Sequence, residues 1–332
     1  MIDPGFSDIL RPQPWPAGSR PMLSFLLILL LVGLVPECLA IDGVPAANPR
    51  SVDADLPEDA AGSLRLVSLN PSLTAIVMAL GAGDRLVGID DYSARVIPAL
   101  ADRPQVGGLF DPSLERIVSL RPDRVLIVAG VDQERHADRL ARLGIEVEVY
   151  RNVRLAEVLE NIERLGVLLH RESAAARRIR SILDTRAAVE AAVRGRPRPG
   201  TLAIVDRAPL FLVGAGTFLD EMLEAVGADN LARRLAKGYP RGSIEWLIDA
   251  RPELLLDLTP GAEPAATFWA RWPSLPAVAA GRVVDLDPTR ISLPGPDLDR
   301  ALVELAVAVH GPGIEPAIER AFGRLARKES PP

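Results

Sequence analysis

The order of apolar and polar positions after residue 64 predicts short strands that alternate with helices. Four apolar runs have the length of buried strands, and they occupy 64–69, 86–89, 124–129 and 146–150. Helical spacing of apolar residues between them predicts helices at 72–80, 112–120 and 133–144. Asp111 is the expected N-cap of the second helix, with Pro112 at its first position. This alternation is typical of a mainly parallel sheet covered by helices.

The middle of the chain has a different pattern. Residues 154–194 contain almost no turn formers, apart from a break near 170–173, and residues 172–193 form one uninterrupted helical run. At 1.5 Å per residue, such a helix would span about 33 Å. That length is sufficient to reach from one lobe to another, and the Gly- and Pro-rich segment 194–200 ends the run.

A second alternation follows this helix. Strands are expected at 201–206, 210–213, 254–258 and 282–287. Helices are expected at 217–226, 243–250 and 297–310, with an amphipathic terminal helix at 314–326. We therefore expect an N-terminal α/β lobe, a bridging helix, a C-terminal α/β lobe and a tail with a short helix, at 64–170, 171–195, 200–310 and 311–332.

The first 63 residues have the pattern of a targeting segment and a tether. Residues 1–40 are interpreted as an N-terminal extension plus a signal peptide, with cleavage after Ala40. Residues 41–63 are small, acidic and Pro-containing, which indicates a flexible tether. Export to the periplasm follows from this interpretation. A lipid anchor at Cys38 is an alternative that Glu37 disfavours, and a retained membrane anchor is a second alternative.

Composition excludes several kinds of site. The net charge of the 332 residues is −6, which disfavours non-specific binding to nucleic acid. Cys38 is the single cysteine, so no intrachain disulfide can form, and three histidines far apart in sequence do not indicate a metal site. We expect no cofactor, no metal site and no catalytic residues.

One segment occurs twice. Residues 110–127 and 239–258 both read as a helix, an Arg-Pro-acid turn and an apolar strand. Glu115 and Glu245 occupy the same position in the two copies, in the first turn of each helix. An acidic residue there complements the helix dipole, but its repetition also suggests a function that both lobes share.

The residues of the first lobe resemble a known family. The runs "RLVSLNPSLTAIVMALGAGDRLVGIDDYS" and "QVGGLFDPSLERIVSLRPDRVLI" look like the helical-backbone class of ABC-transporter substrate-binding proteins, which includes cobalamin, ferric-siderophore and haem receptors. The resemblance covers residues 64–310 and is nearest to the cobalamin-binding members. It implies two Rossmann-like α/β lobes with parallel-rich sheets, one long rigid helix joining them, and a ligand cleft between them.

The resemblance also implies partners and site residues. The partners would be an ABC permease dimer in the inner membrane and a small-molecule ligand, with the receptor itself a monomer. Glu115 and Glu245 match the glutamates that dock on the two permease subunits in the cobalamin receptors. The implied ligand-binding positions are Asn70, Pro71, Tyr92, Leu109, Phe110, Phe211, Tyr239 and Arg290. Tyr92 and Tyr239 are expected in exposed polar loops, and Arg290 in a loop that closes the second lobe.

The sequence leaves alternatives open for both the ligand and the class of function. Cobalamin is the first expectation for the ligand, and a corrin ring needs aromatic and aliphatic walls with neutral hydrogen-bond partners. A ferric siderophore would use Arg207, Arg241 and Arg290, and a haem would use Tyr92 or Tyr239 as an axial ligand. An enzyme with two Rossmann-like lobes would need a phosphate loop, and Gly214-Ala215-Gly216 lacks its remaining glycine. A sensor subunit that binds the same ligand is a further alternative.

Overall fold

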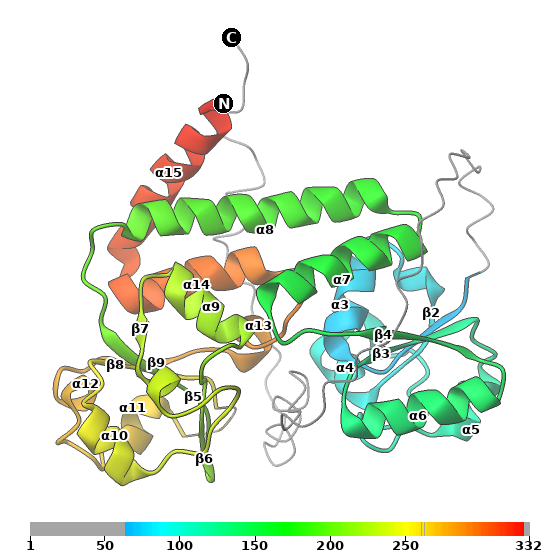
Figure 1. The fold of residues 1–332 in the computed structure, drawn as a ribbon, viewed down its shortest axis with the longest axis horizontal. Helices are drawn as coiled ribbons and strands as arrows, with labels where there is room; N and C mark the ends of the chain where they lie inside the picture. The colour runs from blue at the N-terminus through cyan, green and yellow to red at the C-terminus, as the bar shows by residue number, and fades with distance from the viewer. Residues whose placement is uncertain (1–63, 260, 262, 329–332) are drawn as a thin grey trace, which may run out of the picture.

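The computed structural model describes residues 64–259, 261 and 263–328. The predicted signal peptide, the tether at 41–63 and Cys38 lie outside the described residues. Figure 1 shows two α/β lobes side by side, with one long helix running across both. The prediction of two α/β lobes with parallel-rich sheets is confirmed.

The N-terminal lobe is built on a four-stranded, fully parallel sheet with the strand order β2-β1-β3-β4. The strands are β1 (Leu66–Ser68), β2 (Leu86–Ile89), β3 (Arg124–Val128) and β4 (Glu146–Tyr150). Its helices are α3 (Pro71–Ala79), α4 (Asp91–Val96), α5 (Leu114–Ser119), α6 (Val131–Arg142) and α7 (Leu155–Leu168). Every residue of β1 is buried, as the apolar run at 64–69 predicts.

The C-terminal lobe has the strand order β6-β5-β8-β9, with β7 also paired to β5. Its strands are β5 (Gly200–Arg207), β6 (Leu210–Leu212), β7 (Asp229–Asn230), β8 (Leu254–Asp257) and β9 (Val283–Asp285). Only β6 pairs in the antiparallel sense, as the second strand of a hairpin with β5. The helices are α9 (Phe218–Ala225), α10 (Ile244–Ala250), α11 (Ala265–Trp269), α12 (Pro276–Ala279), α13 (Pro288–Ile291), α14 (Leu298–His310) and α15 (Glu315–Lys328).

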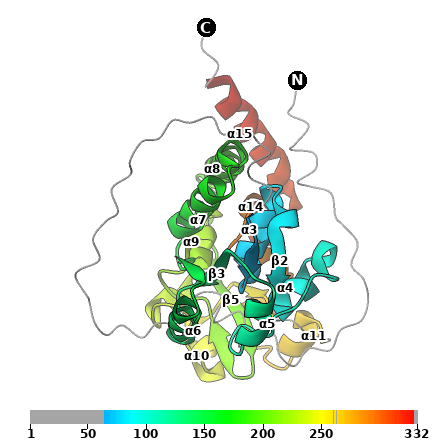
Figure 2. The same ribbon diagram turned by 90° about the vertical axis from the view of Figure 1, so that its right-hand side faces the viewer.

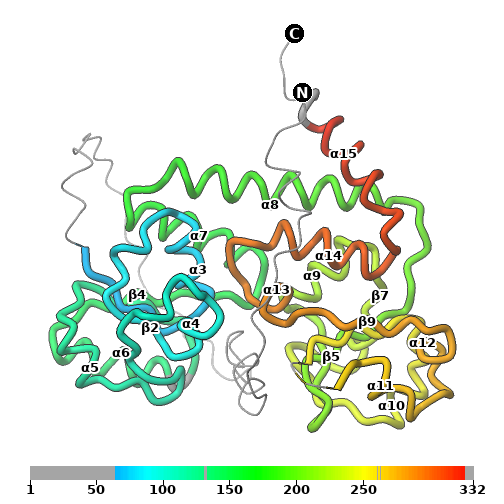
Figure 3. Tube along the Cα trace, turned by 180° about the vertical axis from the view of Figure 1, so that it is seen from behind, coloured from blue at the N-terminus to red at the C-terminus, as the bar shows by residue number. Residues whose placement is uncertain are grey.

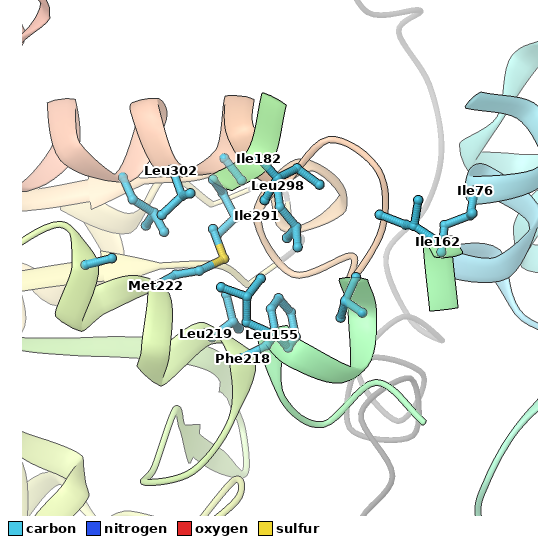
Figure 4. Packing of buried hydrophobic residues seen from close by; sticks show 14 of the residues in the cluster. Ile76, Leu155, Ile162, Ile182, Phe218, Leu219, Met222, Ile291, Leu298 and Leu302 are labelled. Carbon is cyan, nitrogen blue, oxygen red and sulfur yellow. The ribbon is translucent and has the colours of Figure 1, made fainter. Parts of the chain in front are cut away.

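The long helix α8 (Glu172–Val193) has the bounds that the sequence pattern predicts. It packs against α7 of the first lobe and against α14 and α15 of the second. Ile182 at its centre is fully buried, and Figure 4 shows this side chain beside Leu298 of α14. Arg178 pairs with the buried Asp299, whose carboxylate also accepts a 2.8 Å hydrogen bond from Ser181. The helix is thus fixed by both apolar and ionic contacts.

A second connection between the lobes lies where β4 leads into α7. The backbone amide of Phe218, at the start of α9, donates to the carbonyl of Val153 at 2.6 Å. Arg154 forms an ion pair with Glu221 of α9 at 3.1 Å. Figure 4 shows Leu155 of α7 beside Phe218, so an apolar contact accompanies the polar ones. The two lobes are therefore joined at more than one place.

The C-terminal tail forms α15, as its apolar stripe predicts. Ile318 and Ala321 are buried, and Figure 3 shows α15 crossing one end of α8. The start of α5 differs from expectation. The N-cap of α5 is Ser113, whose hydroxyl accepts from the Arg116 amide, and the prediction of Asp111 is wrong. A β-bridge between Pro112 and Gly107 keeps this stretch extended, so the helix begins later.

Neighbouring residues of α8 provide a test of its packing. We expect Ile182→Ala to lower the free energy of unfolding by about 2–5 kcal/mol, because the fully buried side chain leaves a cavity between α8 and α14. Leu183→Ala is the matched control, since Leu183 is 44% exposed, and its effect should stay within about 0.5 kcal/mol. Urea unfolding of both variants gives the comparison. Equal losses of unfolding free energy in the two variants would show that Ile182 does not stabilise the packing of α8 against α14.

Candidate functional site

The first site residues lie where β1 ends and α3 begins. Asn70 is the N-cap of α3, and its side-chain oxygen accepts from the amide and the hydroxyl of Ser72 at 3.0 and 2.6 Å. Pro71 occupies the first helical turn, where it has no amide to satisfy. Asn152, after β4, donates to the Ser72 hydroxyl at 3.3 Å. Asn70 and Pro71 are both buried, so they shape the strand end from inside.

Two atoms of this cluster are unpaired among the described residues. The Nδ2 donor of Asn70 and the Oδ1 acceptor of Asn152 are buried without a hydrogen-bond partner. Buried polar groups are normally satisfied, so the carboxyl ends of β1 and β4 retain hydrogen-bonding capacity. Ligands of open α/β sheets bind at such strand ends.

The loop with Leu109 and Phe110 is held by α6. The Leu109 carbonyl accepts from the side-chain amide of Gln133 at 2.5 Å, and the Phe110 carbonyl lies 3.0 Å from Nε2 of His136. Leu109 is only 4% exposed, whereas Phe110 is half-buried. His136 is also half-buried, so it is a structural contact of this loop and not a solvated side chain.

Tyr92 lies in the first turn of α4, and the expectation that it belongs to a loop is wrong. Asp90 caps this helix through hydrogen bonds from the amides of Tyr92 and Ser93. Burial raises the pKa of Tyr92, and the neighbouring Thr289 of the second lobe opposes that rise. Tyr92 therefore lies beside the second lobe.

Phe211 and Tyr239 contribute from the second lobe. Phe211 is half-buried on β6, where it pairs with Arg241 in a β-bridge. Tyr239 is 4% exposed, and the expectation that it is exposed is wrong. Its ring belongs to the main core cluster, and burial raises its pKa far above the ordinary value. The Tyr239 hydroxyl is buried without a hydrogen-bond partner among the described residues.

Arg290 lies on the short helix α13, beside Thr289, and is exposed. The expectation of a loop is wrong here as well, because Asp287 caps a helical turn that begins at Pro288. Nη2 of Arg290 is 3.2 Å from Oε2 of Glu304. Burial raises the pKa of Glu304, and the Arg290 charge opposes it. Tyr92 and α13 thus meet across the lobes, and this is where the structure brings predicted site elements together.

Arg207 is held by a buried network that sequence reasoning did not find. Its Nε lies 2.9 Å from Oδ2 of Asp257, the last residue of β8, and its guanidinium stacks 4.6 Å from the ring centre of Phe268. The indole of Trp269 donates to the same carboxylate oxygen at 2.6 Å. The signal was present in the sequence, since Asp257 ends a fully apolar strand and needs a buried partner.

The two repeated helices place their glutamates alike. In both α5 and α10 a serine caps the helix, Ser113 and Ser243, and the glutamate stands two residues later. Glu115 and Glu245 are both exposed. A hydrogen bond from its own backbone amide, followed by one from the Ser243 hydroxyl, lowers the pKa of Glu245. Figures 1 and 2 show α5 and α10 at the end of the molecule opposite α8.

Neither a metal-binding cluster nor a helix long enough to span a membrane is a strong feature of the described residues. Within the described ranges, no group of three or more His, Cys, Asp or Glu side chains has an arrangement that would hold a metal ion. No single helix of the described part is both long and apolar enough to cross a membrane. The pair formed by Leu298–His310 and Pro312–Leu325, bent by 117°, meets the length and composition criteria alone.

The chain is similar in sequence to known substrate-binding proteins. The periplasmic binding protein family matches residues 66–289. A vitamin B12-binding protein of Vibrio parahaemolyticus is 26% identical over 242 residues, which cover 73% of this chain and 87% of that protein. An ABC transporter substrate-binding lipoprotein of Bacillus subtilis, YvrC, is 26% identical over 257 residues, covering 74% of this chain and 80% of the relative.

Solved structures share the two-lobed fold. The periplasmic haem-binding protein RhuT of Roseiflexus sp. RS-1 has a TM-score of 0.67 and 25% identity, with 79% of this chain and all of that chain covered. A periplasmic haem-binding protein of Pseudomonas aeruginosa has a TM-score of 0.62 and 28% identity, with 75% and 93% covered. The vitamin B12-binding protein BtuF of Vibrio cholerae, at 23% identity and a TM-score of 0.64, shares the fold over 76% of this chain and 97% of that chain.

The family match spans both lobes and the long helix between them, and the solved relatives have the same architecture. The chain therefore belongs to the periplasmic binding protein family, whose members are substrate-binding proteins and not enzymes.

Proposed function

We propose that this protein is the substrate-binding component of an ABC importer, which binds cobalamin or a related corrinoid between its lobes in the periplasm. The receptor then delivers this cargo to a permease dimer in the inner membrane. The observation that carries the proposal is the similarity to relatives named vitamin B12-binding protein, which extends over both lobes. Ferric-siderophore and haem receptors of the same class are the alternative functions, and haem-binding proteins are among the structural neighbours.

The state of the two tyrosines supports a corrinoid over a haem. A tyrosine that ligates haem iron must present its hydroxyl to the iron at the ligand site. Tyr239 is 4% exposed and its ring is in the core, so it is poorly placed for such a ligand. Burial raises the pKa of both Tyr92 and Tyr239, so both phenols are neutral before cargo binds. Neutral tyrosines are the kind of neighbour that a corrinoid needs.

The state of the arginines supports a neutral ligand over an anionic iron chelate. A ferric siderophore with negative charge would need unpaired guanidinium groups at the site. Arg207 is buried against Asp257, and Arg290 is paired with Glu304. Arg241 is exposed and has no ion pair among the described residues. One available arginine is a weak counter-charge for such a chelate.

The two exposed glutamates support delivery to a permease dimer. Glu115 and Glu245 stand at matched positions on helices at one end of the molecule, and neither has a cationic partner in the described part of the chain. A two-fold symmetric partner presents the same surface twice, so a receptor with two equivalent acidic helices fits it. Charge pairs that become desolvated at an interface set orientation and couple more strongly than exposed pairs.

Visible absorbance tests the identity of the cargo. The purified chain is incubated separately with cyanocobalamin, haem and a ferric siderophore, and then desalted. We expect cyanocobalamin to remain bound in one copy per chain. Phe211→Ala should weaken its binding about 10- to 100-fold, since an aromatic wall is lost, while the matched Phe322→Ala change on α15 should not. Retention of haem alone, with cyanocobalamin removed, would contradict the corrinoid assignment.

Charge reversal tests the delivery step. We expect Glu115→Lys combined with Glu245→Lys to abolish uptake of cargo while the affinity of the purified receptor for cargo is unchanged. The control is Glu160→Lys with Glu163→Lys, two exposed glutamates of α7 on the other side of the molecule. Uptake is measured in cells of the source organism that carry each variant in place of the native gene. A parallel fall in ligand affinity would assign Glu115 and Glu245 to the ligand site instead.

A further inference from the structure

The repeated helices share a second exposed feature besides the glutamate. Val118 and Ile248 stand three residues after Glu115 and Glu245, and they are 42% and 39% exposed. Residues three apart on a helix are surface neighbours, so each carboxylate has an aliphatic side chain beside it. Val118 and Ile248 are two of the six large apolar side chains that are exposed in the described residues. Val118 and Ile248 occupy equivalent positions in the repeat, so their exposure is a shared feature of the two lobes.

The orientation of each helix is fixed from its opposite face. Ile117 and Leu247, which are also matched in the repeat, are fully buried in two different core clusters. A rotation that buried Val118 or Ile248 would expose these core residues. The same geometry therefore holds the exposed aliphatic side chain outward in both lobes.

An aliphatic neighbour changes what the carboxylate can do. A fully hydrated surface ion pair contributes about 0–1 kcal/mol, and salt screens it. Apolar contacts around a charge pair exclude water, which strengthens the pair and adds the free energy of burying the aliphatic surface. A carboxylate alone would also fit many cationic surfaces, whereas a carboxylate beside an aliphatic side chain fits a cation that borders an apolar pocket.

We propose that Glu115 with Val118, and Glu245 with Ile248, form two equivalent two-point patches that bind one pair of identical permease surfaces. Each of these permease surfaces would present a cationic side chain next to an apolar pocket. The inference rests on the proposed function, since it specifies how the receptor meets its permease. The repetition of both features in both lobes is what assigns a two-fold symmetric occupant to the patches.

The experiment uses spheroplasts of the source organism that lack the native gene, titrated with purified receptor and either radiolabelled cyanocobalamin or haem as cargo. Six proteins are compared: the native chain, Glu115→Lys with Glu245→Lys, Val118→Ser, Ile248→Ser, the two serine changes together, and the control Val167→Ser with Leu183→Ser. The control pair is 58% and 44% exposed and lies on α7 and α8, away from the patches. Cargo affinity of each purified protein is measured alongside uptake.

We expect each single change, Val118→Ser or Ile248→Ser, to raise the receptor concentration for half-maximal uptake about fivefold, and the pair to raise it about 25-fold, with cargo affinity unchanged. The control pair should behave like the native chain. Loss of uptake in the lysine variant without any shift in the serine variants would overturn this inference and leave the proposed function standing. If the native chain stimulates uptake of neither cargo, the proposed function fails, and this inference fails with it.

Discussion

The packing of α8 against both lobes is the constraint on which the rest of the structure depends. The helix runs without interruption from Glu172 to Val193, so it contains no hinge about which the lobes could bend. Its buried face meets α7 on one side and α14 and α15 on the other, while Arg178 and Ser181 bind the buried Asp299. A helix held by apolar and ionic contacts along its length permits a rocking of the lobes and opposes a wide opening.

Two further connections restrict the motion of the lobes. The Phe218 amide donates to the Val153 carbonyl where β4 leads into α7, and Arg154 pairs there with Glu221. Tyr92 and Thr289 of α13 are also neighbours across the lobes. These contacts lie at different places from α8, so a single axis of rotation cannot preserve all of them.

The sequence pattern predicted the continuous apolar and helical runs and failed on the short helices. Strands such as β2 and β4 and the helix α8 are continuous apolar or helical runs, and their observed bounds match the pattern. The helices α4 and α13 have six and four residues, too few to show a helical period, so Tyr92 and Arg290 were placed in loops. Tyr239 is buried by its fold neighbours, which no local pattern reports. The roles of the ligand-contacting residues and the domain boundaries remain predictions.

The repeat is preserved in backbone geometry as well as in sequence. Arg121 and Arg251, which follow α5 and α10, both have left-handed backbone conformations, with φ of 46° and 50°. This conformation costs a residue other than glycine about 1 kcal/mol or more, and a glycine would have removed the cost. Both arginines precede a proline and lead directly into a core strand. Because the same strained turn sets the angle between helix and strand in each lobe, the two glutamate-bearing helices leave their sheets in the same way. The feature that is duplicated is therefore the direction in which each lobe presents its helix, as the permease dimer proposed above would require.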